Sequence, residues 1–424
     1  MQRLKDKFVN ILRWSERYTK TDMLYLTSGG LWLTAGNGIN ILSGLILSVA
    51  FANLLPQEAF GTYQFVFSLA AIVGAFSLTG IKASVMRSVS MGLENALQFG
   101  FITHLKWSVG IALGGFALAA YYFINDSATL AISLLVVGSF SPFLESFKIY
   151  QPFFTGKKDF RSSVLFGAWR KPIPIIALLV ALAVTDNPAI LVFVYFLSHT
   201  ATAGALFWYV LKKYPGARTH HDTQNVAKKE STLVYAKHLS FLNILGSVAE
   251  NLDKVLLFHY LGAAEVAVYT LARMPQSHIS KLAGMGKTLS FPKMTTQPIA
   301  EIRRTLPRKL SLFFLLLLGI VIIYALAAPF IFRLLFPQYI DAVLFSQALA
   351  FLLLFMPFSL MQQVFGAHAR KKEMYILSTG GQIIKIALLL ALLPLYGIWG
   401  AVAALFATQT IKGIASAYFL FTAK

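Results

Sequence analysis

Residues 310–335 read LSLFFLLLLGIVIIYALAAPFIFRLL, a long apolar run with a single arginine near its end. About 20 apolar residues are enough to cross the ~30 Å hydrocarbon core of a bilayer as a helix. The segment before the run, 303–309, reads RRTLPRK, whereas the turn after it carries Asp341 and no lysine or arginine. This asymmetry is typical of a transmembrane helix that obeys the positive-inside rule.

The same pattern recurs along the whole chain and predicts twelve membrane-spanning segments. These segments must be helices, because lipid offers the backbone no hydrogen-bond partners. We therefore expect an all-α integral membrane protein, and the even number of spans places the N and C termini together on the cytoplasmic side. The expected spans are 30–55, 63–81, 97–124, 128–149, 164–184, 189–210, 239–261, 266–290, 310–335, 341–364, 374–394 and 397–421.

Composition supports this class of protein. The chain has 424 residues with 37 lysines and arginines against 17 acidic residues, yet 57% of its residues are hydrophobic. A soluble basic protein does not combine those values. The positive residues are spread over alternate short loops, so we expect them to face anionic lipid head groups of the bilayer and expect no nucleic-acid partner. The absence of cysteine excludes disulfides, thiolate metal sites and cysteine nucleophiles.

The chain divides at its one long hydrophilic segment into two halves. The turn Leu55–Tyr63 in the first half resembles Leu261–Tyr269 in the second half, with leucine and tyrosine at equal spacing. Equal topology in both halves indicates parallel repeats, and so two pseudo-symmetric six-helix bundles. The expected organisation is a basic cytoplasmic tail at 1–22, a first bundle at 23–210, a cytoplasmic linker at 211–238 and a second bundle at 239–424.

Four short motifs point to a known family. They occur in order at the expected outer ends of spans, and together they resemble the polysaccharide-transporter branch of the multidrug/oligosaccharidyl-lipid/polysaccharide (MOP) flippase superfamily. Twelve spans fit its O-antigen and exopolysaccharide flippases better than its lipid II flippases, which have two extra helices. The motifs are LLPQEAFGTY at 54–63, NLDKVLL at 251–257 with YLG at 260–262, FIFRLLFPQY at 330–339 and PLYGIWGAVAA at 394–404.

The resemblance implies a function. It implies a flippase in the bacterial inner (plasma) membrane that moves polyprenyl-pyrophosphate-linked oligosaccharides from the inner to the outer leaflet, for O-antigen, capsule or exopolysaccharide synthesis. Transport would proceed by alternating access between the two halves. A monomer would suffice, and the polysaccharide polymerase machinery is a further expected partner.

Cations within the expected spans of the second half are the first candidates for the substrate site. A charge inside the bilayer is costly, so it usually faces a cavity or a partner. Arg273, Lys254 and Lys385 are such residues, and Lys385 has no carboxylate within its own span. A pyrophosphate needs cations to replace its lost water, and an arginine fork binds phosphate oxygens in pairs.

Two carboxylates in the second half leave alternatives open. Glu250 and Lys254 are spaced i and i+4 in the order that favours an intrahelical ion pair, which would be purely structural. Asp253 could instead pair with Arg273 on the next helix, and it falls where the resembled family tends to place an aspartate. Both carboxylates are therefore candidates for gating or for coupling to H⁺ or Na⁺.

The first half offers a second set of candidates near the cytoplasmic side: Lys106, Arg170 and Lys171 as substrate-binding cations, and Glu145 for gating or coupling. Arg170 and Lys171 precede Pro172 and Pro174, so the fifth span should kink there. Paired cations at a kink could receive a phosphate from the cytoplasm. The alternative is ordinary positive-inside anchoring.

Two other functions were weighed against the flippase. A membrane glycosyltransferase or polymerase needs a catalytic cluster in a substantial loop, but the expected outer loops are short and carry at most one carboxylate each. An exporter of small cationic drugs needs unpaired carboxylates in its cavity, whereas the membrane charges here are mainly positive. We expect a transporter rather than an enzyme, with no metal and no cofactor, because metal-ligand spacings and the GxxxxGK[ST] motif are both absent.

The expected topology is directly testable. Green fluorescent protein fused within 211–238 should fluoresce, and alkaline phosphatase fused within 185–188 should be active, because the first segment is expected inside and the second outside. Reporter activities measured on whole cells decide this. The reverse pattern would overturn the expected orientation.

Overall fold

The structure is a computed structural model, and it describes residues 23–218, 226–296, 299–368 and 370–422. The expected N-terminal tail at 1–22 lies outside the described residues. Helices account for almost all of this part of the chain, and no strand occurs within it. The all-α fold expected from the sequence is therefore confirmed.

The first half, residues 23–218, contains ten α-helices. Several expected spans are built from two consecutive helices that meet at a break in the backbone, such as α5 and α6 at Ser108. The helices are α2 (Met23–Leu54), α3 (Gln57–Ala75), α4 (Ile81–Ser90), α5 (Ala96–Trp107), α6 (Val109–Ile124), α7 (Ala128–Phe147), α8 (Tyr150–Gly156), α9 (Phe160–Trp169), α10 (Pro172–Val184) and α11 (Pro188–Lys213), followed by the 3₁₀ turn η1 (Pro215–Arg218).

The second half, residues 226–422, contains longer helices. Short 3₁₀ or π segments interrupt it between some of them. The elements are α12 (Val226–Leu261), α13 (Ala263–Thr296), α14 (Ile299–Leu335), η3 (Pro337–Tyr339), α15 (Ala342–Ala350), η4 (Phe351–Phe355), α16 (Met356–Ala367), α17 (Lys371–Tyr375), η5 (Ile376–Gly380) and α18 (Gly381–Thr422).

Nine segments of the described chain are long and apolar enough to cross a membrane. One of them, 372–422, covers two expected spans, because α18 contains non-helical backbone at Gly397, where φ is +57°. A Cβ on Gly400 would lie 2.1 Å from the Leu392 carbonyl oxygen, so the two arms of α18 meet closely at this bend. The other two expected spans lie in α12 and α13, which carry too many polar groups to qualify by apolarity alone. The number twelve remains a prediction.

Some expected boundaries were wrong. The second span was expected at 63–81, but α3 begins at Gln57 directly after Pro56 and ends at Ala75. Proline fixes its own φ near the helical value and is therefore a common residue at a helix start. The expected linker 211–238 is also helical at both ends, since α11 runs to Lys213 and α12 begins at Val226.

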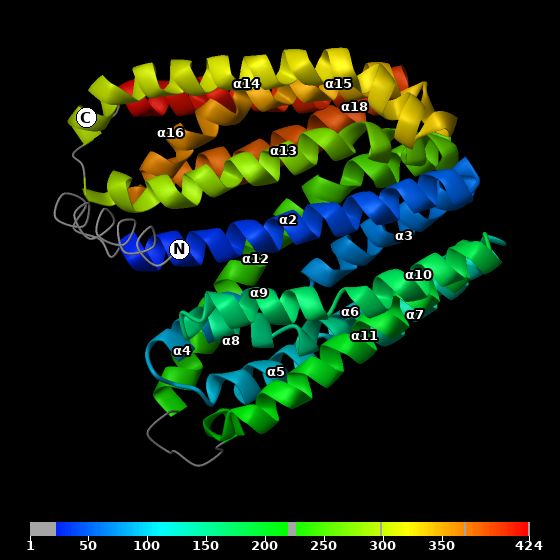
Figure 1. Cartoon of the computed structure of the whole chain (residues 1–424), viewed down its shortest axis with the longest axis horizontal. Helices are drawn as coiled ribbons and strands as arrows, with labels where there is room; N and C mark the ends of the chain where they lie inside the picture. Colours follow the sequence, from blue (N-terminus) through cyan, green and yellow to red (C-terminus); the bar gives the residue numbers. More distant parts are fainter. Residues whose placement is uncertain (1–22, 219–225, 297–298, 369, 423–424) are drawn as a thin grey trace, which may run out of the picture.

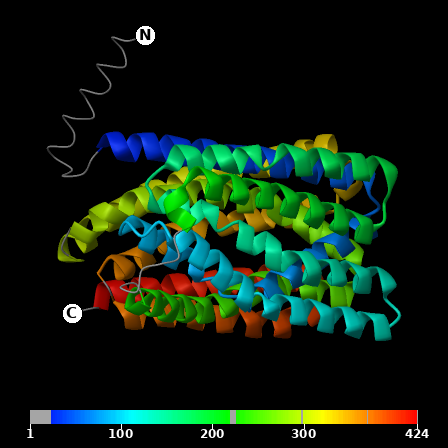
Figure 2. The ribbon, with the colours of Figure 1, turned by 90° about the horizontal axis from the view of Figure 1, so that it is seen from below.

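The helices form two bundles with two long helices between them (Figure 1). Helix α12 crosses from one bundle to the other: it packs against α3 and α4 of the first half and against α13 and α18 of the second. Helix α2 packs against α9 and α10 and also touches α13. Figure 2 shows that α2 begins and α18 ends at the same end of the molecule.

The two ends of the molecule differ in charge. We call the end that carries Lys157, Lys158, Lys212 and Lys213 the basic end. The opposite end, with the short turns at 55–56, 125–127, 185–187 and Gly262, is called the turn end. The start of α2, the end of α18 and these basic turns therefore lie at the same end of the molecule.

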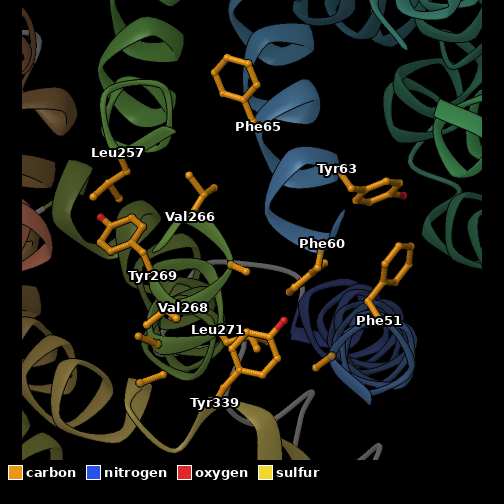
Figure 3. Close-up of a cluster of buried hydrophobic side chains, with 14 of the residues drawn as sticks. Phe51, Phe60, Tyr63, Phe65, Leu257, Val266, Val268, Tyr269, Leu271 and Tyr339 are labelled. Atoms are coloured by element: carbon orange, nitrogen blue, oxygen red, sulfur yellow. The ribbon is translucent and has the colours of Figure 1, made fainter. Parts of the chain in front are cut away.

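The halves meet tightly at the turn end. One hydrophobic core there contains buried residues of both halves, including Phe60, Phe65 and Tyr269 (Figure 3). The Phe65 ring stacks on Phe258 with centroids 3.8 Å apart, and Phe60 meets Tyr339 edge to face at 6.4 Å. Figure 3 shows Phe60 of α3 between Phe51 and Tyr339, so aromatic packing ties the halves together.

At the basic end the cores are separate. One cluster contains buried residues of the first half, the first of them Leu78 and the last Ala217, together with Ala236 in the N-terminal part of α12. Another joins Ile302 to Leu420 within the second half. Within the described residues, the large apolar core shared by both halves lies near the turn end. Near the basic end, α12 contacts the first half through Ala236 and through a hydrogen bond from Gly80 N to Ser240 Oγ of 2.9 Å.

Gly61 allows the closest approach between the halves. A Cβ on Gly61 would lie 1.7 Å from the carbonyl oxygen of Ala263, a backbone atom that cannot rotate away. Gly61→Ala should therefore separate the halves at the turn end, because such overpacking costs about 1–3 kcal/mol. Gln57 of α3 and Gln338 of η3 face each other across this contact, since Gln57 Nε2 donates a hydrogen bond of 2.6 Å to the Gln338 carbonyl oxygen. Cysteines placed at these two positions should therefore cross-link with a lower yield in the Gly61→Ala protein.

Gly74 provides a matched control in the same helix α3, because a Cβ there has nothing within 4 Å. Gly74→Ala should leave the Gln57–Gln338 cross-link unchanged. Equal yields in the Gly61→Ala and Gly74→Ala proteins would contradict the proposed role of this contact.

Candidate functional site

A buried ionic cluster occupies the second half. Asp253 of α12 is 0% exposed, and it accepts a hydrogen bond of 2.8 Å from the Tyr269 hydroxyl and one of 2.9 Å from the Lys254 backbone N–H. Arg273 Nη1 forms an ion pair with the same carboxylate. Tyr269 and Arg273 are one turn apart on α13, which Gly262 (φ +96°) brings back alongside α12. The carboxylate is thus fully satisfied, as a buried charge requires.

Lys385 is the unpaired cation of this cluster. It lies on α18, is only 7% exposed, and makes no hydrogen bond or ion pair with any described residue. It is within electrostatic range of Asp253, Arg273 and Glu250. Since Arg273 already pairs with Asp253, the ammonium of Lys385 has no ion-pair partner among the described residues.

The intrahelical pair considered from the sequence is not formed. Within the described residues, no ion pair links Glu250 to Lys254, although their i and i+4 spacing permits one. Glu250 is exposed, whereas Lys254 is half-buried and interacts electrostatically with Asp253 and Arg273. The buried carboxylate of Asp253 attracts the Lys254 ammonium more strongly than the exposed carboxylate of Glu250 does, because a low dielectric strengthens the attraction between charges. The local charge remains positive.

The first half holds a second ionic cluster. Glu145 of α7 forms ion pairs with Lys148 at 2.5 Å, one helical turn later, and with Lys82 of α4 at 2.7 Å. His104 is buried beside it and hydrogen-bonds Ser146 at 2.9 Å through Nδ1. Glu145 is thus held between two cations, which gives it a structural role in joining α4 to α7.

Arg170 and Lys171 lie between two helices, as the prolines predicted. Helix α9 ends at Trp169 and α10 begins at Pro172, so the expected kink is confirmed. The Nε and Nη1 atoms of Arg170 are buried and have no hydrogen-bond partner in the described part of the chain. An uncompensated buried guanidinium is costly, so this group is suited to receive an anion.

Lys106 lies apart from these groups. It is exposed on α5, and no hydrogen bond or ion pair joins it to another described residue. The structure therefore brings together Arg170 and Lys171 in the first half, and Lys254, Arg273 and Lys385 with Glu250 and Asp253 in the second.

Two cavities adjoin Arg170 on opposite faces of α9. The inner cavity has a volume of about 310 Å³ and is lined by polar side chains of α2, α8 and α9, including Asn37, Asn40 and Gln151. The outer cavity, of about 750 Å³, lies between α9 and α11 and includes Trp169 and Tyr209. Arg170 lines both cavities.

Sequence reasoning missed several of these residues. Tyr269 was noted only in the repeated turn motif, yet its i, i+4 spacing to Arg273 places both side chains on one face of α13. Lys148 and Lys82 were not singled out from the sequence, although Lys148 is one turn from Glu145. The polar lining of the inner cavity comes from three helices, and no spacing along the chain brings it together.

Comparison with known proteins gives one family. The sequence model of the family described as polysaccharide biosynthesis protein matches residues 26–297, more than half of the chain. A comparison with proteins of curated function gives no match.

Solved structures of similar fold are membrane transporters. An inward-facing multidrug resistance MATE family transporter of the MOP superfamily has a TM-score of 0.67 at 15% identity, over 90% of this chain and 96% of that chain. The outward-facing conformation of such a transporter has a TM-score of 0.60 at 15% identity, over 94% and 95%. A MOP superfamily transporter from Pyrococcus furiosus, described by the reverse polarity of its binding pocket, has a TM-score of 0.63 at 15% identity, over 94% and 95%. These likenesses show the fold.

The Asp253–Arg273 pair makes a clear stability prediction. Arg273→Met alone should lower the thermal stability of the purified protein strongly, since removing one partner of a buried pair costs about 3–5 kcal/mol. Adding Asp253→Asn should recover part of the loss, because no bare charge then remains. Glu250→Gln serves as a control, since this carboxylate is exposed. Purely additive losses in the double variant would show that the two groups do not act as a pair.

Proposed function

Because the chain belongs to the polysaccharide biosynthesis protein family, we propose that it is a flippase for polyprenyl-pyrophosphate-linked oligosaccharides. It would move completed repeat units from the inner to the outer leaflet of the bacterial inner membrane for O-antigen, capsule or exopolysaccharide synthesis. The observation that carries this proposal is the pair of buried cations, Arg170 and Lys385, that have no anionic partner in the described structure.

The polarity of the two clusters supports an anionic substrate. Each half contains carboxylates, but Asp253 and Glu145 are occupied by cations of the protein itself. Positive groups are left over in both halves, and a pyrophosphate carries the charge and the oxygen acceptors that such groups bind. The sugars would occupy the polar lining nearby.

The distribution of apolar packing supports alternating access. The halves share a core at the turn end and have separate cores at the basic end. With the basic end in the cytoplasm, as the positive-inside rule requires, separation of the halves at this end would open the transporter toward the leaflet where the substrate is assembled. Release outside would require the contacts of Gly61 and Phe65 to separate.

The energy source is part of the proposal. Flipping can proceed downhill if the polymerase machinery consumes the product outside, or it can be coupled to H⁺ or Na⁺. Since Asp253 and Glu145 are held in ion pairs, Glu250 is the carboxylate most available for such an ion. A single chain contains both halves, so a monomer suffices for transport.

A drug exporter on the same fold is the second candidate. A site for cationic drugs would need unpaired carboxylates facing the cavity, and the pairing of Asp253 and Glu145 disfavours this. An enzymatic role for the same lipid carrier would need an acid–base cluster at one end of the bundle, and the clusters described above lie among the helices instead.

The proposal predicts a glycan phenotype. Cells that lack the protein should accumulate complete lipid-linked repeat units on the cytoplasmic leaflet, out of reach of a membrane-impermeant oxidant. Lys385→Gln should reduce rescue by about 10-fold or more, because a hydrogen bond to a charged group contributes ~1.5–3 kcal/mol. The matched control Lys212→Gln removes an exposed lysine at the basic end and should rescue fully.

Each alternative has its own result. Repeat units that reach the outer leaflet but stay unpolymerised in the deletion strain would favour an enzyme. An unchanged glycan profile together with greater sensitivity to cationic drugs would favour the exporter.

A further inference from the structure

Helix α9 forms a wall between two spaces of different character. Ser163 and Gly167 face the inner cavity, which α2 and α8 enclose on its other sides. Phe166 and Trp169 lie on the other face of α9 and line the outer cavity, beside α10 and α11 (Figure 1). One short helix thus separates a smaller cavity with a mainly polar lining from a larger one lined by aromatic, aliphatic and charged side chains.

The outer cavity is built like a groove for a lipid. Trp169 and Ile173 are 73% and 61% exposed, and Tyr209 is also exposed, so this face would contact the hydrocarbon of the bilayer. Charged residues also line this cavity: Asp159, Arg161, Arg170 and Lys213. Asp159 is engaged, since its carboxylate caps α9 by accepting a hydrogen bond of 2.9 Å from the Ser162 N–H. An apolar surface that also carries more cations than carboxylates matches an anionic lipid with its chain in the membrane.

The inner cavity is built for a different part of a ligand. Its lining side chains include Asn37, Asn40, Gln151, Thr155 and Ser163, which offer both donors and acceptors. The charged residues that line it are Arg170 and Lys171, with no carboxylate among its described lining. A volume of about 310 Å³ accommodates a small polar group such as a sugar residue.

Arg170 stands where the two cavities meet. Helix α9 ends at Trp169 and α10 begins at Pro172, so Arg170 lies in the break between them and lines both spaces. Its Nε and Nη1 are buried without a partner in the described chain, and a guanidinium carries five N–H donors in a planar, forked arrangement. Such a fork binds two oxygens of a phosphate at once.

We propose that Arg170 holds the pyrophosphate of the lipid-linked substrate in the break between α9 and α10, with the polyprenyl chain in the outer cavity and the first sugar in the inner cavity. This inference rests on the proposed flippase function and assigns it an entry site in the first half. A membrane phospholipid could use the outer cavity alone, but only a lipid with a polar group beyond its phosphates uses both.

Binding to the full-length protein in phosphatidylcholine nanodiscs tests the site. The probe is radiolabelled geranylgeranyl pyrophosphate, with inorganic pyrophosphate and phosphatidylglycerol as competitors. Arg170→Gln should weaken probe binding about tenfold or more, while Arg170→Lys, which keeps the charge without the fork, should weaken it less. Trp169→Ala should weaken binding of geranylgeranyl pyrophosphate but leave the weaker binding of inorganic pyrophosphate unchanged, because only the geranylgeranyl chain is expected to touch Trp169. Lys212→Gln, next to the outer cavity but not lining it, should bind normally.

The inner cavity has its own readout. Asn37→Ala and Gln151→Ala should leave probe binding unchanged, because the probe has no sugar. In a cell that lacks the native protein, the same variants should reduce export of the complete lipid-linked glycan. Normal export by both variants would show that the inner cavity does not hold the sugar, and would overturn that part of the proposal.

The other outcomes are distinguishable. Phosphatidylglycerol that displaces the probe as well as unlabelled geranylgeranyl pyrophosphate does would mark a phospholipid site and overturn the proposal. Unchanged probe binding in the Arg170→Gln protein, with normal glycan export in cells, would overturn this site while leaving the flippase function intact. No probe binding by the native protein, together with a normal glycan profile in the deletion strain, would overturn the proposed function itself.

Discussion

The cost of an unpaired charge inside hydrocarbon shapes this molecule. A buried ion must find a partner, reach water or wait for a ligand, because the low dielectric makes isolation expensive. The protein meets this demand for its carboxylates: Asp253 is held by Arg273 and Tyr269, and Glu145 by Lys148 and Lys82. Cations outnumber carboxylates, so Lys385 and Arg170 are left over. This excess of positive charge is the reason for proposing an anionic substrate.

Close backbone contact holds the two halves together at the turn end. Gly61 lies against the Ala263 carbonyl, and the Phe65 and Phe258 rings stack beside it, so little slack exists between the halves. Packed interfaces of this kind have discrete arrangements rather than continuous ones. At the basic end, the described apolar residues form two distinct clusters, one centred on the first half and one within the second half. In the proposed alternating access, these contacts at the turn end would have to separate before the substrate is released outside.

The sequence predicted the parts of this fold that depend on local rules. Apolar run length predicted the helices, and Pro172 predicted the break after α9, because both follow from backbone chemistry. The start of α3 was misplaced, since an apolar run does not show where the helix begins relative to Pro56. Helical spacing suggested a Glu250–Lys254 pair, which is not formed, whereas the Asp253–Arg273 pair, the alternative also considered from the sequence, is formed. The unpaired state of Arg170 was invisible, because it depends on three helices that meet only in the fold.

The positions of the two unpaired cations bear on how a bulky substrate could cross. Arg170 lies in a wall that opens to the membrane on one side and to a polar space on the other, whereas Lys385 is enclosed within the second half. A pyrophosphate bound at Arg170 can keep its chain in the bilayer, which avoids the large cost of moving a polyprenyl chain through a polar cavity. Lys385 in the second half offers a further cation for the same charge in the proposed transport cycle. One cationic site on each half would let the pyrophosphate pass from one to the other without losing a positively charged partner at any stage.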